Sequence, residues 1–256
     1  MEQRTYALGE RYIGAGKRTG KIELYEVPGN ALGTYLDGAE IVLHANAQDA
    51  TGDTMNAGEI TIYGSTGDAA GYAMRGGSIY VQGDAGYRAG IHMKAYEDKV
   101  PVLVIGGRAG SFLGEYQAGG VIVVLGIGSE DRQPVGNFCG TGMHGGRIFL
   151  RTEHLPKDLP QQVIAEKASA QDMEIAAPLI RRYCEKVRRG RCGAARRHLL
   201  YAASELEEPI QAAVCDELTA RVSMDGGFCR KTLMRSALAK KKCGCVILYN
   251  KFGPRI

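Results

Sequence analysis

Short runs of alternating apolar residues recur along the chain at a nearly constant spacing. Between Gly58 and Met93 one pattern occurs twice in register, in which an Ile-x-Ile/Val pair is followed by glycines and then by a methionine. The leading apolar residues of successive copies stand 19 residues apart, except at two steps that carry insertions of five and seven residues. These leading residues are Ile22, Ile41, Ile60, Ile79, Leu103, Ile122 and Ile148. The pattern therefore indicates seven repeats.

Each repeat has parts that predict a strand, a corner and a core position. The apolar pair has the period of two that is typical of a short strand with one buried face. Glycines at fixed offsets, as at Gly64, Gly67 and Gly71, predict corners with positive φ or close backbone approach. The closing residue is expected to fill the core, as methionine does well. That position holds Leu36, Met55, Met74, Met93, Gln117 and Met143.

Such short strands cannot fold alone, but stacked copies share backbone hydrogen bonds and bury a continuous core. Residues 1–151 are therefore predicted to form an all-β domain, a single-stranded parallel β-helix of about seven coils. The seven leading residues should stack in one inward column. Two insertions, at residues 94–99 and 128–133, interrupt the spacing. They mark either a functional or contact face, as insertions in repeat proteins often do, or merely solvated loops.

The periodicity changes after Leu150. Residues 152–185 contain no glycine, whereas residues 1–151 contain 30. Ser169-Ala-Gln-Asp172 has the form of a capping box, and apolar residues follow at helical spacing, so 152–186 is predicted to be a helical cap segment. Pro178 is expected to kink this helix or to mark its true start. The apolar face consists of Met173, Ala176, Ala177, Ile180 and Cys184.

Composition narrows the class of protein. No apolar run approaches the roughly 20 residues that a membrane helix requires, and the first residues, Met1-Glu-Gln-Arg-Thr-Tyr6, contain no apolar signal region. Seven cysteines without framework spacing read as reduced thiols. We therefore expect a cytoplasmic protein with no membrane segment. The net charge of +4 combines −5 in residues 1–185 with +9 in residues 186–256, and the basic end alone would hint at nucleic acid.

Several connecting segments carry a resemblance to a known family. Residues 10–151 resemble the GXGXG domain, the right-handed parallel β-helix at the C-terminus of the large chain of glutamate synthase. They are most similar to its stand-alone form, found where that enzyme is split into separate chains. The matching segments are Glu10–Gly16, Val27–Asn30, Asn46–Ala50, Gly71–Gly77, Gly86–Lys94, Gly114–Gly120 and Asn137–Gly146. A structural chain of formylmethanofuran dehydrogenase shares the bare glycine repeat without these connecting segments.

The resemblance implies a non-catalytic structural subunit of glutamate synthase, the enzyme that moves glutamine-derived ammonia to 2-oxoglutarate. Its expected partners are a glutamine amidotransferase and an FMN-containing synthase subunit, with FMN and an iron-sulfur cluster on those partners and no cofactor on this chain. No nucleic acid or membrane is expected as a partner. Two alternatives stay open: a structural subunit of a formylmethanofuran dehydrogenase-type complex, and an independent solenoid that binds a ligand.

Candidate chemical motifs have structural explanations. Gly140-Thr-Gly-Met-His-Gly145 matches the dinucleotide fingerprint, but Gly146–Leu150 after it reads as a strand where the motif requires a helix. Cys139 and His144 lack the paired spacing of a zinc site, so a buried thiol and a corner histidine are expected. His92 and His144 adjoin core methionines, which favours packing. The turn aspartates should make Asx contacts, these being Asp49, Asp53, Asp68 and Asp84. No catalytic, cofactor-binding or metal-binding residues are predicted.

The last part of the chain departs from the resemblance at about Val187. In the family the chain ends on a segment like Asn-Pro-Tyr-Lys-Gln-Leu-Tyr. Codons for Asn-Ser-Lys followed by that segment, read one frame later, can spell Glu205-Leu-Glu-Glu-Pro-Ile-Gln-Ala-Ala-Val214. Residues 187–256 are therefore predicted to be a poorly ordered tail translated out of frame, and its charge and cysteines would then carry no functional information. The alternative is a divergent basic extension with its own role.

Overall fold

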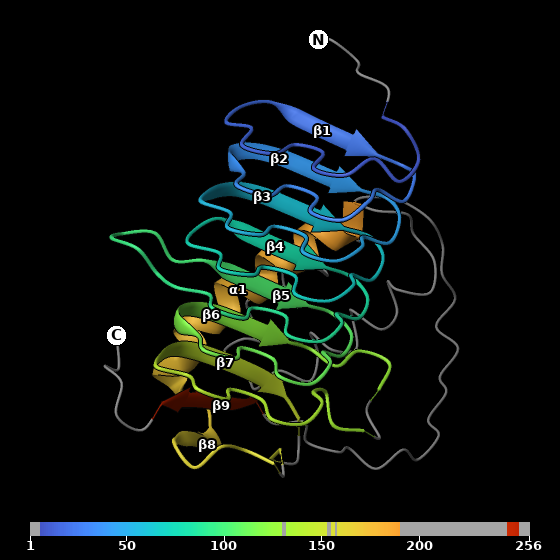
Figure 1. The fold of residues 1–256 in the computed structure, drawn as a ribbon. Coiled ribbons are helices and arrows are strands. Elements are labelled where there is room, and N and C mark those ends of the chain that lie inside the picture. Colours follow the sequence, from blue (N-terminus) through green and yellow to red (C-terminus); the bar gives the residue numbers. More distant parts are fainter. Residues whose placement is uncertain (1–5, 130–131, 153–154, 157, 190–244, 251–256) are drawn as a thin grey trace, which may run out of the picture.

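The computed structural model describes residues 6–129, 132–152, 155–156, 158–189 and 245–250. Its main feature is a nine-stranded sheet in the order β1-β2-β3-β4-β5-β6-β7-β9-β8. The first seven strands are parallel and follow one another in sequence order, so each strand lies beside the next one along the chain (Figure 1). They are β1 (Lys21–Leu24), β2 (Asp37–Leu43), β3 (Ala57–Ile62), β4 (Ser78–Val81), β5 (Val102–Ile105), β6 (Ala118–Val124) and β7 (Gly145–Arg151).

The predicted register is confirmed at every step of the parallel sheet. Each leading apolar residue pairs with its counterpart on the next strand, beginning with Ile22 against Ile41 and ending with Ile122 against Ile148. Ile22 is 5% exposed and the other six are fully buried. The residues two places further on form a second buried column, as the period of two requires. This second column contains Leu24, Leu43, Ile62, Val81, Ile105, Val124 and Leu150.

The loops between these strands are also in register, so a strand and its following loop make one coil of a stack. Backbone bonds join the loops at equal offsets, for example from Gly52 N to Leu32 O at 2.7 Å and from Gly90 N to Ala70 O at 2.7 Å. The methionine position is buried as predicted, with exposures of 0–1% from Leu36 to Met143. Gln117, the polar member of that column, donates from Nε2 to the carbonyls of Gly119 and Gly120.

The corner of each coil uses left-handed backbone at alternate residues. The middle one of three such positions is glycine in every coil. In each coil except that of Gly71, the missing side chain makes room for the core residue of a later strand. The outer two positions tolerate side chains, including those of Tyr35, Arg88 and His92 at φ of about +55°. The middle glycines are Gly14, Gly33, Gly52, Gly71, Gly90, Gly114 and Gly140.

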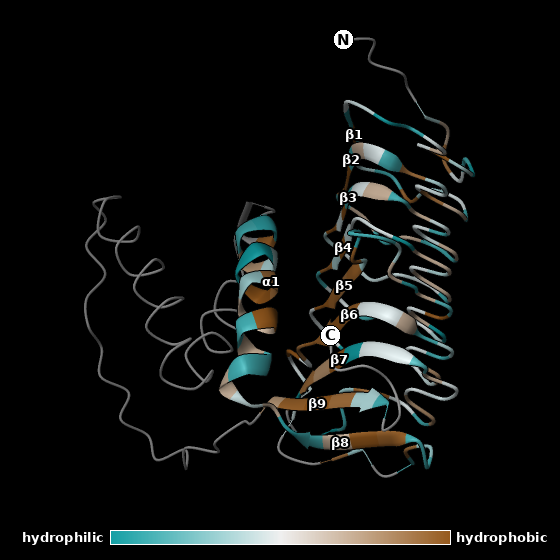
Figure 2. Ribbon diagram, turned by 90° about the vertical axis from the view of Figure 1, so that its left-hand side faces the viewer, coloured by the Kyte–Doolittle hydropathy of each residue, from teal (hydrophilic) through white to brown (hydrophobic). Residues whose placement is uncertain are grey.

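The helix α1 (Ala170–Arg189) covers the outer face of the sheet (Figure 2). The capping box is confirmed, since Asp172 Oδ2 accepts from Ser169 N at 3.0 Å and Asp172 N donates to Ser169 Oγ at 3.2 Å. Its apolar face packs on outward residues of β4 to β7 in a second core cluster that includes Val104, Phe149 and Ile180. Of the two expectations for Pro178, the one that it marks the start of the helix is wrong, because α1 begins eight residues earlier and continues through the proline.

The stack is closed at its C-terminal end by two antiparallel strands. β9 (Cys245–Asn250) pairs with β7 and with β8 (Val163–Lys167), so it lies between them. The stretch 152–186 thus contains β8 and most of α1, and α1 lies along the side of the stack rather than across its end (Figures 1 and 2). β9 belongs to the stretch 187–256 that we predicted to be a poorly ordered, out-of-frame tail. Residues 190–244 and 251–256 of that stretch lie outside the described residues.

In the part of the chain that the structure describes, no helix combines the length and the apolar character needed to cross a membrane.

Candidate functional site

The turn aspartates bind the neighbouring coil. Asp49 Oδ1 accepts from Asp68 N at 2.9 Å, and Asp68 Oδ1 accepts from Tyr87 N at 2.8 Å, each 19 residues further on. Asp84 Oδ1 accepts from Arg108 N at 2.7 Å. We expected Asx contacts inside each turn, so the partner differs from the prediction. The carboxylates of Asp49, Asp68 and Asp84 thus hold successive coils together.

The motif at Gly140–Gly145 leads into a strand, as predicted. β7 begins at Gly145, so there is no helix N-terminus to receive a pyrophosphate. Cys139 is buried in the core, and burial raises the pKa of its thiol to about 12. His144 is exposed, so the two side chains are not neighbours at one site.

Aromatic side chains gather on the corner of the later coils. The ring of His92 stacks on Tyr116 with centroids 5.1 Å apart and meets the edge of Tyr72 at 5.9 Å. Beside them Phe112 stacks on Phe138 at 5.2 Å. The expected packing of His92 therefore occurs on the surface against tyrosines rather than against the core methionine. We call these five residues, together with Arg88, the aromatic corner.

Arg88 links the aromatic corner to a partly buried acid. Its guanidinium lies over the Phe112 ring at 5.1 Å, and its Nε donates to Glu115 Oε2 at 3.0 Å. Tyr72, Tyr116 and Phe138 are each between 39% and 49% exposed. Tyrosine and arginine are the residues most enriched at energetically important positions of protein interfaces. The aromatic corner is thus the strongest candidate for a contact surface among the loops.

A cluster of opposite charges fastens the C-terminal half of α1 to the sheet. Lys186 Nζ pairs with Glu59 and lies 3.1 Å from Glu40 Oε1, while Arg182 lies 3.4 Å from Glu59 Oε2. The Lys186 side chain is 10% exposed and that of Glu59 18%. These charges are all engaged with each other, so the cluster fixes the helix and offers no group poised for acid or base chemistry.

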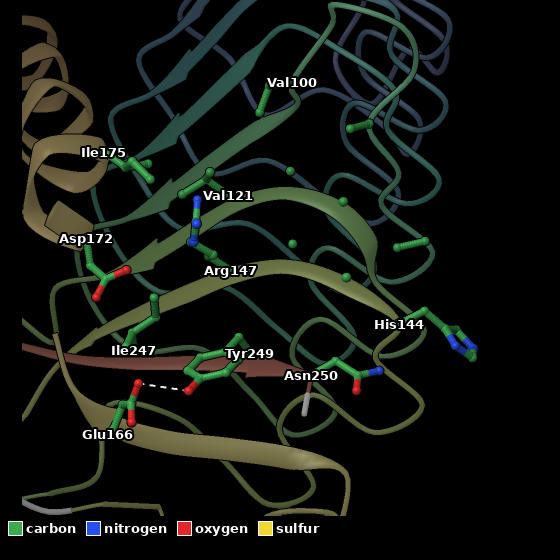
Figure 3. Close-up of a pocket in the computed structure, with 16 residues that line it drawn as sticks. Val100, Val121, His144, Arg147, Glu166, Asp172, Ile175, Ile247, Tyr249 and Asn250 are labelled. Carbon is green, nitrogen blue, oxygen red and sulfur yellow. Dashed lines mark hydrogen bonds between the residues drawn. The ribbon is translucent and has the colours of Figure 1, made fainter. Parts of the chain in front are cut away.

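A recess of about 440 Å³ lies at the other end of α1 (Figure 3). Its floor is the start of β6 and β7, including Gly119, Gly120 and Gly146; β9 and the first turns of α1 form the walls. The insertion at residues 94–99 contributes Ala95 to its lining. Arg147, Glu166 and Asp172 bring charge to this recess, and Tyr249 Oη donates to Glu166 Oε1 at 2.8 Å across one wall. His144 points away from it (Figure 3).

Within the described ranges, no three His, Cys, Asp or Glu side chains converge as metal ligands would. Cys139 is a buried thiol without a disulfide partner. Sequence reasoning missed Arg147 and Asp172 as site residues. The sequence did contain a signal for Arg147, because it occupies an outward strand position at which the two preceding strands carry valine.

Comparison with known proteins gives two matches. The sequence pattern of the GXGXG motif family matches residues 3–197. An uncharacterized protein of Methanocaldococcus jannaschii is 50% identical over 183 residues, which cover 70% of this chain and 70% of that protein.

Proposed function

Because the chain belongs to the GXGXG motif family, we propose that it is a non-catalytic structural subunit of a glutamate synthase and acts in a cytoplasmic complex. In this role it holds a glutamine amidotransferase and an FMN-containing synthase subunit at a fixed separation. FMN and an iron-sulfur cluster reside on those partners and not on this chain. The parallel stack is, in this proposal, a right-handed single-stranded β-helix like that of the glutamate synthase domain.

The observation that carries the proposal is how the repeated residues are used. The recurring isoleucines, methionines, glycines and aspartates all serve contacts within or between coils. Such a stack is rigid because each coil is bonded to the next on the strand side and on the loop side. A rigid solenoid presents long faces on which two partners can be held apart. The aromatic corner, with its half-exposed stacked rings, would serve as one of those contacts.

The test is reconstitution with separately purified partners. The chain alone should be colourless and should form no glutamate from glutamine and 2-oxoglutarate. Added to the amidotransferase and synthase subunits, it should increase glutamate formation from glutamine much more than from free ammonia, because only the former needs ammonia to pass between subunits. Flavin absorbance in the purified chain, or equal stimulation with both nitrogen donors, would refute the scaffold role.

A further inference from the structure

Arg147 occupies an unusual place on the outer face of the sheet. Register aligns it with Val121 and Val102 on the preceding strands and, beyond Ser78, with Glu59 and Glu40. The two glutamates pair with Lys186 of α1, and the two valines pack in the second core cluster. These two valines and two glutamates thus help to attach α1 to the sheet, whereas Arg147, at the equivalent strand position, faces the recess.

The Arg147 guanidinium has five donors but makes no hydrogen bond or ion pair with any residue that the structure describes. Asp172 lies on the same recess, at the start of α1, and its Oδ2 accepts from both Ser169 N and Ser169 Oγ. Its second oxygen, Oδ1, has no partner among the described residues. Both side chains point into the recess (Figure 3), yet they do not pair with each other.

We propose that this recess binds a small α-amino acid as its zwitterion. The carboxylate lies against Arg147, whose planar fork matches a carboxylate in two hydrogen bonds. The ammonium lies against Asp172. The apolar side chain of the ligand contacts Val121, Ile175 and Ile247, which line the same recess.

The charges of the recess favour a zwitterion over a simple anion. A ligand with only a carboxylate would leave Asp172 without a counter-charge and would lie close to that acid. A ligand with only an ammonium would leave the guanidinium unpaired. The volume of about 440 Å³ lies within the range of small-molecule sites. Arg147, Asp172, Val121 and Ile175 all precede residue 187, whereas Ile247 and the wall formed by β9 lie in the stretch 187–256.

The test compares three probes of the same shape by calorimetric titration of the full chain. L-Leucine carries both charges, 4-methylpentanoate only the carboxylate, and 3-methylbutylamine only the ammonium. We expect leucine to bind with a Kd of about 1 mM or tighter and each single-charge probe to bind at least roughly tenfold more weakly. Equal binding of leucine and 4-methylpentanoate, or no leucine binding at about 10 mM, would overturn the proposal.

Variants then assign the two contacts. Arg147→Gln should weaken leucine binding roughly tenfold or more while leaving the binding of 3-methylbutylamine unaffected. Asp172→Asn should weaken leucine binding to a similar degree while leaving the binding of 4-methylpentanoate unaffected. Asn keeps an acceptor for Ser169, so the helix cap is retained. The matched control is Arg75→Gln, which removes an exposed arginine from another corner. Circular dichroism shows whether each variant is folded, and a loss of binding in Arg75→Gln equal to that in Arg147→Gln would count against the site.

Discussion

The Cδ1 atom of Ile122 occupies the space that a side chain at Gly90 would need. A Cβ built on Gly90 would lie 2.5 Å from that atom, whereas a Cβ on Gly71 would meet nothing closer than 3.7 Å. The two glycines have the same corner position and nearly the same φ, +69° and +70°. The difference arises because the residue that faces Gly71 in the same way is Leu103, whose branching leaves the space open.

This pair separates backbone strain from steric overlap. Both Gly71→Ala and Gly90→Ala place a Cβ on left-handed backbone, at a cost of about 1–2 kcal/mol. Gly90→Ala must in addition displace a buried isoleucine, which typically costs a further 1–3 kcal/mol. We therefore expect urea unfolding to show Gly90→Ala as the less stable variant by about that further amount. Equal unfolding midpoints would mean that Ile122 moves aside freely.

The charged contact between Lys186 and Glu59 is the next test, because it is shielded from solvent. Among the described residues, Lys186→Met leaves Glu59 paired only with Arg182 and Glu40 without a paired cation. Removing one member of a buried ion pair typically costs about 3–5 kcal/mol, reduced here because Glu40 is 38% exposed and Arg182 remains. We expect a loss of about 1–3 kcal/mol and faster amide hydrogen exchange in the C-terminal half of α1.

A surface pair provides the control for this variant. Arg18 lies 3.3 Å from Asp37, but its side chain is 81% exposed. Exposed pairs contribute little, so Arg18→Met should leave both stability and α1 exchange nearly unchanged. If Arg18→Met were as destabilising as Lys186→Met, burial would not be the reason for the effect.

The sequence predicts the register of the parallel strands well because one spacing of 19 residues repeats, and a shift of one residue would turn every inward isoleucine outward. The position of α1 was less accessible, although a signal was present. β1 alternates charged and apolar residues, whereas β5 is apolar throughout, as a strand buried on both faces is. That difference indicates that a second element covers the later strands.

The closing strands and the recess could not be predicted for a different reason. β9 enters the sheet between β7 and β8 although it lies far along the chain from both, and nothing in the local pattern of Cys245–Asn250 specifies such distant partners. Arg147 and Asp172 line the same recess only because α1 runs back along the sheet (Figure 3). Neither residue belongs to a spacing motif that points to a ligand, so only the tertiary arrangement brings them together.

The buried thiol of Cys139 gives a prediction for alkaline pH. Burial raises its pKa from an ordinary value of 9 to about 12, so the folded state disfavours the thiolate. Below pH 9 the Cys139 thiol is protonated in both the folded and the unfolded state, so it adds no pH dependence. Above pH 9 it ionises in the unfolded state only, so the free energy of unfolding falls as the pH rises. The slope attributable to this one group is about 1.4 kcal/mol per pH unit. Cys139→Val, of similar size, should show a shallower loss of stability between pH 9 and 10.5.

Tyr183 titrates in the same direction, because burial also raises the pKa of its phenol. The contribution of Tyr183 begins above pH 10 and is the same in the original chain and in Cys139→Val. The difference in their free energies of unfolding between pH 9 and 10 therefore reports on Cys139 alone. Parallel stability curves for the two proteins over that interval would show that Cys139 ionises as readily folded as unfolded.

The aromatic corner makes the final prediction, which concerns assembly. His92 and Tyr116 stack at an interplanar angle of 11°, and Tyr116 is 45% exposed. Paired rings of this kind are already ordered, so a partner that covers them loses little further side-chain entropy. Truncating a central aromatic residue of an interface commonly costs about 2 kcal/mol or more, which is about thirtyfold in affinity. Tyr116→Ala should therefore weaken binding to one purified partner subunit by roughly that factor, measured by surface plasmon resonance.

The control for this variant is Tyr25→Ala. Tyr25 is 65% exposed and also stacks on a histidine, His44, with centroids 4.4 Å apart, but it lies at the end of β1, away from the aromatic corner. Both substitutions thus remove one ring from a surface stack and should have similar effects on stability. If Tyr116 lies in the contact and Tyr25 does not, only Tyr116→Ala lowers the affinity. A loss of affinity in both variants would mean that the contact surface extends along the stacked coils from Tyr25 to Tyr116. A loss in neither would remove the aromatic corner from the contact surface, and another face of the chain would then have to bind the partner.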